Sequence, residues 1–63
     1  MRNEVAALRR ARGLSQVALA EALDVSRQTI NSIENGRYDL SLPLALRIGR
    51  LSERQVEEIF ILT

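Results

Sequence analysis

Residues 16–33, QVALAEALDVSRQTINSI, contain two short amphipathic patterns on either side of a tight turn. The first pattern predicts a helix over about 16–23, with Ser15 as its N-cap and its apolar side chains on one side. The second predicts a helix over about 27–35, capped by Ser26. The connection between them is very short, and two short helices joined so closely have the geometry of a helix-turn-helix.

Further helices are predicted on both sides of this pair. The preceding helix covers about 3–12, and Gly13 stands where a left-handed helix stop is expected. After the pair, Ser41 is the N-cap of a helix that runs to about Arg50 and tolerates Pro43 in its first turn.

The last predicted helix covers about 53–60. It begins at Ser52-Glu53-Arg54-Gln55, which matches a capping box, and it is followed by the apolar, β-prone tail 61–63. The pattern therefore predicts an all-α fold of five helices, and we expect one domain over residues 1–63.

The composition argues against metal, cofactor and enzyme functions. The 63 residues include no cysteine, histidine or lysine. The usual zinc, haem and iron–sulfur ligand sets are therefore missing, as are the commonest nucleophile, the commonest general base and a Schiff-base amine. We expect no metal site, no cofactor and no enzymatic activity. A chain this small buries only about 60% of its unfolded surface, so we expect its stability to depend on close packing or on a second copy of the chain.

Hydropathy and charge indicate a soluble protein. No apolar run approaches the ~20 residues of a membrane span, and the N-terminal residues do not resemble a signal peptide, so we expect a cytoplasmic location. Nine arginines against eight acidic residues give a formal charge of only +1. Where the arginines lie therefore matters more for phosphate contact than the net charge, and most of them lie at or before Arg37.

The helix over 27–35 has one apolar side and one polar side without acidic residues. Ile30 and Ile33 mark the apolar side, and the polar side carries Arg27, Gln28, Asn31 and Ser32. Arginine pairs bidentately with guanine, and glutamine and asparagine pair bidentately with adenine, so this side has the chemistry of base-edge readout. The alternative is that it is an ordinary solvated helix surface.

Three longer strings carry a family resemblance. Gly13-Leu14-Ser15-Gln16, Val25-Ser26-Arg27-Gln28-Thr29-Ile30 and Ile33-Glu34-Asn35-Gly36-Arg37-Tyr38 are similar to the signature of the lambda-repressor-like (Xre, Cro/cI-type) prokaryotic regulators. The resemblance spans about residues 4–60 without a gap. It implies a compact five-helix domain whose third helix enters the major groove of double-stranded DNA.

The resemblance also implies roles for single residues. It assigns base reading to Arg27, Gln28 and Ser32, with Asn31 beside them, and it implies that Arg9 and Glu34 form a structural ion pair. The implied phosphate-binding residues are Ser15, Gln16, Asn35, Arg37 and Tyr38. For these residues the alternatives are a surface amide at Gln16, a solvated loop after the third helix, and a packing role for Tyr38.

The sequence departs from the family pattern at three places. Asp24 stands where the family usually has glycine, and aspartate is one of the few residues that tolerate a left-handed conformation. Val17 stands where a polar residue is common, and it is either harmless, close to a thymine methyl or part of an interface. Ser52–Gln55 lacks the usual glycine stop, so the last helix either restarts at Ser52 or continues the fourth helix.

The function expected from the resemblance is sequence-specific regulation of transcription, with repression of a palindromic operator by a homodimer. The C-terminal segment supplies the candidate dimer residues, which are Val56, Ile59, Phe60, Ile61 and Leu62. An antitoxin-like or phage-type protein-interaction module is the alternative, with Val17, Ile61 and Leu62 as its working surface. No small-molecule site is evident. An enzyme acting on nucleic acid is a third possibility, which lacks any recognisable catalytic motif.

Overall fold

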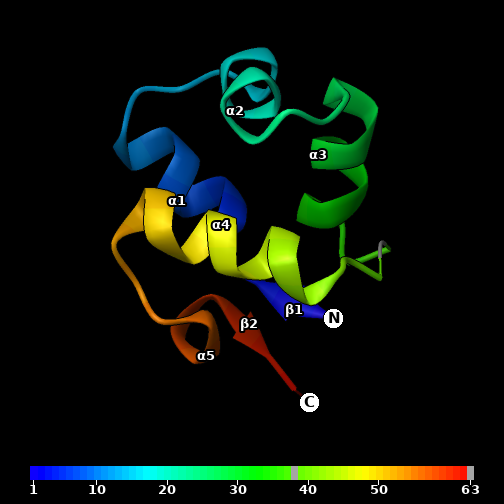
Figure 1. Ribbon diagram of the computed structural model, residues 1–63, viewed down its shortest axis with the longest axis vertical. Helices are drawn as coiled ribbons and strands as arrows, with labels where there is room; N and C mark the ends of the chain where they lie inside the picture. Colours follow the sequence, from blue (N-terminus) through cyan, green and yellow to red (C-terminus); the bar gives the residue numbers. More distant parts are fainter. Residues whose placement is uncertain (38, 63) are drawn as a thin grey trace.

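A computed structural model of the chain describes residues 1–37 and 39–62. These residues form five helices and one pair of very short strands, and α4 crosses the middle of the molecule (Figure 1). The elements in chain order are β1 (Arg2–Asn3), α1 (Val5–Ala11), α2 (Gln16–Leu23), α3 (Arg27–Glu34), α4 (Leu42–Ser52), α5 (Val56–Ile59) and β2 (Phe60–Ile61).

The predicted serine caps start three of the helices. The hydroxyl oxygens of Ser15, Ser26 and Ser41 accept hydrogen bonds from the backbone N–H groups of Ala18 (3.0 Å), Thr29 (3.1 Å) and Leu44 (3.3 Å). Each bond satisfies one of the N–H groups that the first turn of a helix leaves without a partner. The start positions of α2, α3 and α4 are therefore confirmed.

A residue in the left-handed conformation follows the end of α1, and another follows the end of α2. Gly13 has φ 69° after α1, as predicted, and Asp24 has φ 59° after α2. The turn of the helix-turn-helix thus keeps its left-handed residue although the side chain is not glycine. Because a left-handed L-residue is disfavoured by about 1–2 kcal/mol, this turn forms at a cost in stability.

The predicted start of the last helix is wrong. Ser52 is the final residue of α4, and Glu53 follows it in the left-handed conformation with φ 57°. The N-cap of α5 is Gln55, whose backbone N–H donates to the Glu58 carboxylate at 2.9 Å. Glu53 thus ends α4 where the family has glycine, and α4 and α5 are separate helices with a short turn between them.

A small antiparallel strand pair was not predicted by the sequence pattern. Arg2 pairs with Ile61 and Asn3 with Phe60, which joins the two ends of the described chain. The backbone N–H of Glu4 extends this pairing by donating to the carbonyl of Ile59 at 2.9 Å. The fold is therefore helical with a two-residue strand at each end, and the β-prone tail of the sequence supplies one of the strands.

The core lies where α4 meets the other helices. The most deeply buried side chains, each at most 2% exposed, are Val5, Leu23, Ile30, Ile33, Ile48 and Ile59. Ile59 is one of the predicted dimer residues, and that assignment is wrong because its side chain is 0% exposed within its own chain. No helix in the described part of the chain has the length and apolar character needed to cross a bilayer.

Candidate nucleic-acid interface

The turn between α2 and α3 is fixed from both sides. The backbone N–H of Val25 donates to the carbonyl of Ala20 at 3.0 Å, which closes the turn around Asp24. From α4, the guanidinium of Arg47 donates to the carbonyl of Leu23 at 2.7 Å. A carbonyl at a helix C-terminus has no partner within the helix, so this bond satisfies it. Sequence reasoning missed Arg47, since nothing in its local sequence indicates a partner 24 residues away.

The structure brings the predicted base-reading residues to one side of α3. Arg27, Gln28 and Asn31 are exposed and Ser32 is half-buried. On the opposite side, Ile30 and Ile33 are 0% and 1% exposed and pack into the core. Burial of the two isoleucines thus fixes the rotation of α3 about its axis, and its polar side faces solvent.

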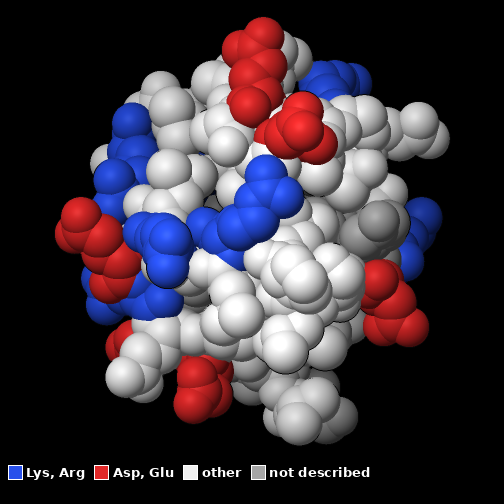
Figure 2. Space-filling model, viewed as in Figure 1, with Lys and Arg blue, Asp and Glu red and all other residues white. Residues whose placement is uncertain are grey.

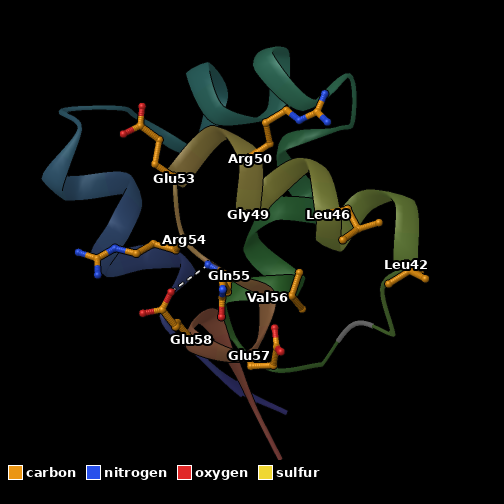
Figure 3. A pocket seen from close by; sticks show the side chains of 10 residues that line it. All are labelled: Leu42, Leu46, Gly49, Arg50, Glu53, Arg54, Gln55, Val56, Glu57 and Glu58. Carbon is orange, nitrogen blue, oxygen red and sulfur yellow. Dashed lines mark hydrogen bonds between the residues drawn. The ribbon is translucent and has the colours of Figure 1, made fainter.

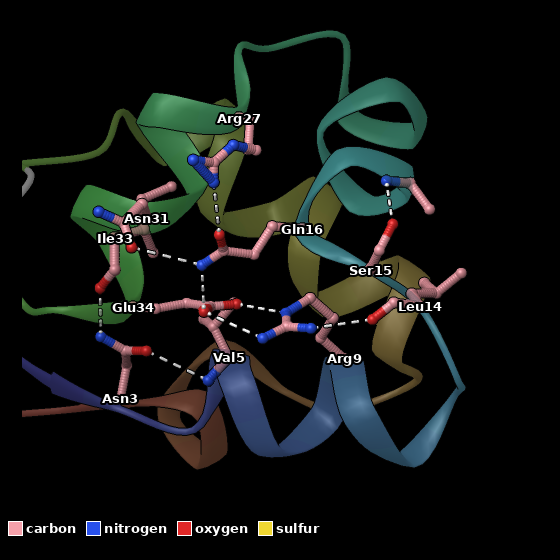
Figure 4. Close-up of polar contacts among 11 residues, drawn as sticks. Asn3, Val5, Arg9, Leu14, Ser15, Gln16, Arg27, Asn31, Ile33 and Glu34 are labelled. Carbon is pink, nitrogen blue, oxygen red and sulfur yellow. Dashed lines mark hydrogen bonds and ion pairs between the residues drawn. The ribbon is translucent and has the colours of Figure 1, made fainter.

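Gln16, the first residue of α2, links this polar side to the rest of the molecule (Figure 4). Its Nε2 group donates to Glu34 Oε1 at 3.0 Å and to Asn31 Oδ1 at 3.4 Å, and its Oε1 accepts from Arg27 Nη1 at 3.3 Å. One amide therefore contacts two of the predicted base-reading side chains and the last residue of α3.

Arg9 and Glu34 form the ion pair that the resemblance implies. Arg9 Nε lies 2.7 Å from Glu34 Oε2, and the two side chains are only 11% and 8% exposed. Arg9 also donates to the carbonyl of Leu14 at 2.9 Å, so its guanidinium joins α1, the loop before α2 and the end of α3. Arg9 thus contacts the C-terminal end of α3, and Glu34, which lies on the same side of α3 as Arg27, is largely buried in this pair.

The pair shifts the ionisation of both partners. Burial alone raises the pKa of Glu34, but hydrogen bonds from Arg9 and Gln16 and the charges of Arg9 and Arg10 outweigh it, so the pKa lies below its ordinary value. The hydrogen bond to Glu34 raises the pKa of Arg9 against the opposing effect of desolvation. Both groups are therefore charged at neutral pH.

The segment after α3 begins with a glycine turn. Gly36 has φ 72°, its N–H donates to the carbonyl of Ile33 at 3.0 Å, and the N–H of Arg37 donates to the carbonyl of Ser32 at 3.0 Å. This is a Schellman ending, which fixes the path of the chain as it leaves the helix. Asn35 and Arg37 are exposed beside it, and Tyr38, the third predicted phosphate-binding residue of this loop, lies outside the described residues.

Asn3 is a second residue that sequence reasoning missed. Its Nδ2 donates to the carbonyl of Ile33 at 2.7 Å, and its Oδ1 accepts from the N–H of Val5 at 3.1 Å (Figure 4). Asparagine is favoured near helix N-termini, which is a local signal for the bond to Val5. The bond to α3 crosses 30 residues of sequence and has no such signal.

A groove runs between α4 and α5 on another face (Figure 3). Leu42, Leu46, Gly49 and Val56 form its apolar part. Leu42 and Leu46 are 67% and 54% exposed, which is high for leucine. Charged side chains of both signs border the groove, namely Arg50, Arg54, Glu53, Glu57 and Glu58.

Comparison with known proteins agrees with this geometry. The family model described as Helix-turn-helix matches residues 5–57. An HTH-type transcriptional regulator of Methanocaldococcus jannaschii is 46% identical over 61 residues, covering 97% of this chain and 92% of that protein. One of Methanothermobacter thermautotrophicus is 49% identical over 63 residues, covering 98% and 91%.

A solved structure has the same fold. The restriction-modification controller protein C.AhdI from Aeromonas hydrophila superposes with a TM-score of 0.77 at 30% identity, over 89% of this chain and 85% of that one. The fold and the α2–α3 unit define a helix-turn-helix DNA-binding protein. The chain belongs to the helix-turn-helix family of transcriptional regulators, of the lambda-repressor-like type that its sequence resembles.

Proposed function

We propose that the protein is a sequence-specific repressor that places α3 in the major groove of a palindromic operator. The observation that carries this proposal is the exposed side of α3, where Arg27 and Asn31 are held by the Gln16 amide and the carboxylate of Glu34 is largely buried in its pair with Arg9. Arg27 reads guanine, and Gln28 and Asn31 read adenine, because their donors and acceptors match these base edges. Ser32 completes the reading side. The proposed activity is binding rather than catalysis.

Phosphate contacts on either side of α3 set its position in the groove. At the start of α2, Ser15 and Gln16 stand beside backbone N–H groups and the positive end of the helix dipole, which together favour an anion. After α3, Asn35 and Arg37 are exposed at the glycine turn. Tyr38 remains a prediction of the sequence at this second position. Such contacts orient the protein on the duplex without reading the bases.

A second copy of the chain is the proposed occupant of the groove between α4 and α5. Exposed Leu42 and Leu46 form much of its apolar part, and Arg50, Arg54, Glu57 and Glu58 border it. Figure 2 shows an area without charged side chains in the lower central part of this face, with basic side chains to its upper left and acidic ones to its right and lower left. Such a surface is complementary to itself under a two-fold rotation, because basic groups of one copy meet acidic groups of the other.

The candidate dimer residues near the C-terminus contribute unequally to this proposed interface. Val56 borders the groove and is half-buried, and Leu62 is 89% exposed. Phe60 and Ile61 are half-buried and belong to β2, which pairs with β1 of the same chain. We therefore propose α4 and Val56 as the centre of the dimer, with Leu62 at its edge.

Selection of bound DNA from a random pool tests the proposed function. The expected result is an inverted repeat whose half-sites are about 34 Å apart, one turn of B-DNA. Sedimentation at micromolar concentration is expected to give a dimer. A pool without sequence enrichment contradicts the proposal, and a monomer that still selects an inverted repeat contradicts only the proposed interface.

A further inference from the structure

We propose that Asn3 is a positioning residue for DNA binding, which holds the C-terminal end of α3 and the loop that carries Arg37. The inference rests on the proposed function, because it concerns the phosphate contacts of that loop. It assigns a DNA-related role to a residue of β1, outside the helix-turn-helix.

The side chain of Asn3 both donates and accepts hydrogen bonds, and besides the two bonds to helix ends its amide nitrogen donates to the carbonyl of Met1 at 3.3 Å. Its amide nitrogen donates to the carbonyl of Ile33 at 2.7 Å, near the end of α3, and its oxygen accepts from the N–H of Val5 at 3.1 Å, at the start of α1. Both partners belong to helix ends, where backbone groups lack partners within the helix. A carboxylate cannot replace this amide, because it accepts hydrogen bonds and does not donate them.

Asn3 itself is held in place by the strand pair. It lies opposite Phe60 in the β1–β2 ladder, and the next residue, Glu4, is bonded to Ile59. The backbone also packs closely against the loop after α3, since a Cβ on Gly36 would lie 2.8 Å from the carbonyl oxygen of Met1. Asn3 therefore connects α3 to a part of the molecule that is fixed by the core.

The carbonyl of Ile33 links Asn3 to the loop that follows α3. It accepts from Asn3 and also from the N–H of Gly36 at 3.0 Å, so both of its lone pairs are used. Arg37 follows immediately and is bonded to Ser32. Loss of the Asn3 bond releases the end of α3 next to Arg37. Arg27 lies at the other end of α3 and is held separately by Gln16.

A double-mutant cycle on the selected operator tests the inference. In the otherwise unchanged chain, Arg37→Ala is expected to reduce the slope of log affinity against log salt by about one unit. Asn3→Asp is expected to reduce the slope by a similar amount, and adding Arg37→Ala to Asn3→Asp is expected to change it no further. Base preference at the Arg27 position should persist in Asn3→Asp. If adding Arg37→Ala to Asn3→Asp lowers the slope by a further full unit, the inference is overturned.

Asn3→Asp is chosen because it separates the acceptor function of Asn3 from its donor function. An aspartate keeps the acceptor for Val5 and loses the donor to Ile33 and to the Met1 carbonyl. Asn3→Ala, which loses both, shows by comparison what the cap on α1 contributes. Thermal melts identify the temperature at which each variant is folded, and binding is measured below it. If Arg37→Ala leaves the salt slope of the unchanged chain intact, the proposed phosphate contact itself is wrong and the inference fails with it.

A measurement on the unsubstituted chain provides an independent test. Binding of DNA to the loop stabilises whatever holds the loop in place, because the coupling between the two is reciprocal. Hydrogen exchange of the Asn3 side-chain amide is therefore expected to slow severalfold when operator DNA is added. An exchange rate that DNA leaves unchanged overturns the inference.

Discussion

Gln16 Nε2 donates to Glu34 Oε1 at 3.0 Å, and this bond fixes which way the Gln16 amide faces. A carboxylate accepts hydrogen bonds only, so the NH2 group of Gln16 must point toward Glu34. The amide oxygen is then left for Arg27, which lies 3.3 Å away and can only donate. The Arg9–Glu34 pair thereby determines how Arg27 is held on the polar side of α3.

Replacing Gln16 with methionine tests this relationship. Gln16→Met keeps the length of the side chain and removes all its hydrogen bonds. We expect weaker operator binding by about 1 kcal/mol, the typical contribution of one hydrogen bond, and a weaker preference at the base pair that Arg27 contacts. Competition binding against operators changed at that base pair measures both effects. Gln28→Ala is the control, which should change preference at a different position. If Gln16→Met weakens every sequence equally, Gln16 is a phosphate contact that does not orient Arg27.

The pH dependence of stability is expected to report on Glu34. Its pKa in the folded protein lies below the ordinary value of 4.5. The carboxylate therefore contributes stability that is fully present above about pH 4.5 and is lost as the pH falls through the lowered pKa. Melting temperatures between about pH 7 and pH 3 are expected to fall more steeply for the unchanged protein than for Glu34→Gln. Parallel curves for the two proteins would show that Glu34 does not contribute in this way.

Glu53→Gly is expected to stabilise the protein. Glu53 has φ 57°, which glycine adopts without steric cost, whereas an L-residue pays about 1 kcal/mol there. The ion pair it gives up is weak, because Arg12 lies 4.0 Å away and the Glu53 side chain is 83% exposed. The melting temperature should rise by about 4–8 °C for a gain of 1 kcal/mol in a domain of this size. Glu53→Ala, which keeps a Cβ, should give no comparable rise. An equal rise in both variants would mean that backbone strain at this position is not the cause.

Leu46→Glu is expected to convert the proposed dimer into a monomer. It places a negative charge in the apolar centre of the groove between α4 and α5, where Leu46 is 54% exposed in the single chain. Sedimentation should show the monomer, and affinity for the palindrome should fall by about 10-fold or more, while affinity for one half-site is unchanged. Val17→Glu, at a side chain 51% exposed on α2, is the control for sedimentation. A Leu46→Glu protein that remains dimeric excludes this face as the interface.

Local sequence rules predicted the helix-turn-helix well. The three serine caps and the left-handed residues at Gly13 and Asp24 depend on interactions within a few residues, so their positions follow from the sequence pattern. The polar side of α3 was also predictable, because the spacing of Ile30 and Ile33 determines which side is buried.

Local sequence rules did not predict contacts between residues that are far apart in the sequence. Near the C-terminus, two segments match the sequence pattern of a capping box. One is Ser52–Gln55, and the other begins at Gln55. The packing of α4 on the following turn decides between them, since a Cβ on Gly49 would lie 2.9 Å from the Arg54 carbonyl. The partners of Asn3 and Arg47 lie 30 and 24 residues away. No local pattern indicates these contacts, although both are made to the C-terminal ends of the two helices of the helix-turn-helix.

Comparison of Arg27→Ala with Arg37→Ala on selected operators is the most direct test of base reading by α3. Arg27→Ala is expected to cost about 1–3 kcal/mol and to relax the preference at one position of each half-site. Arg37→Ala is expected to weaken binding to all sequences alike and to reduce the salt slope by about one unit. Losses for Arg27→Ala that are the same on every sequence would contradict the assignment of α3 as the reader.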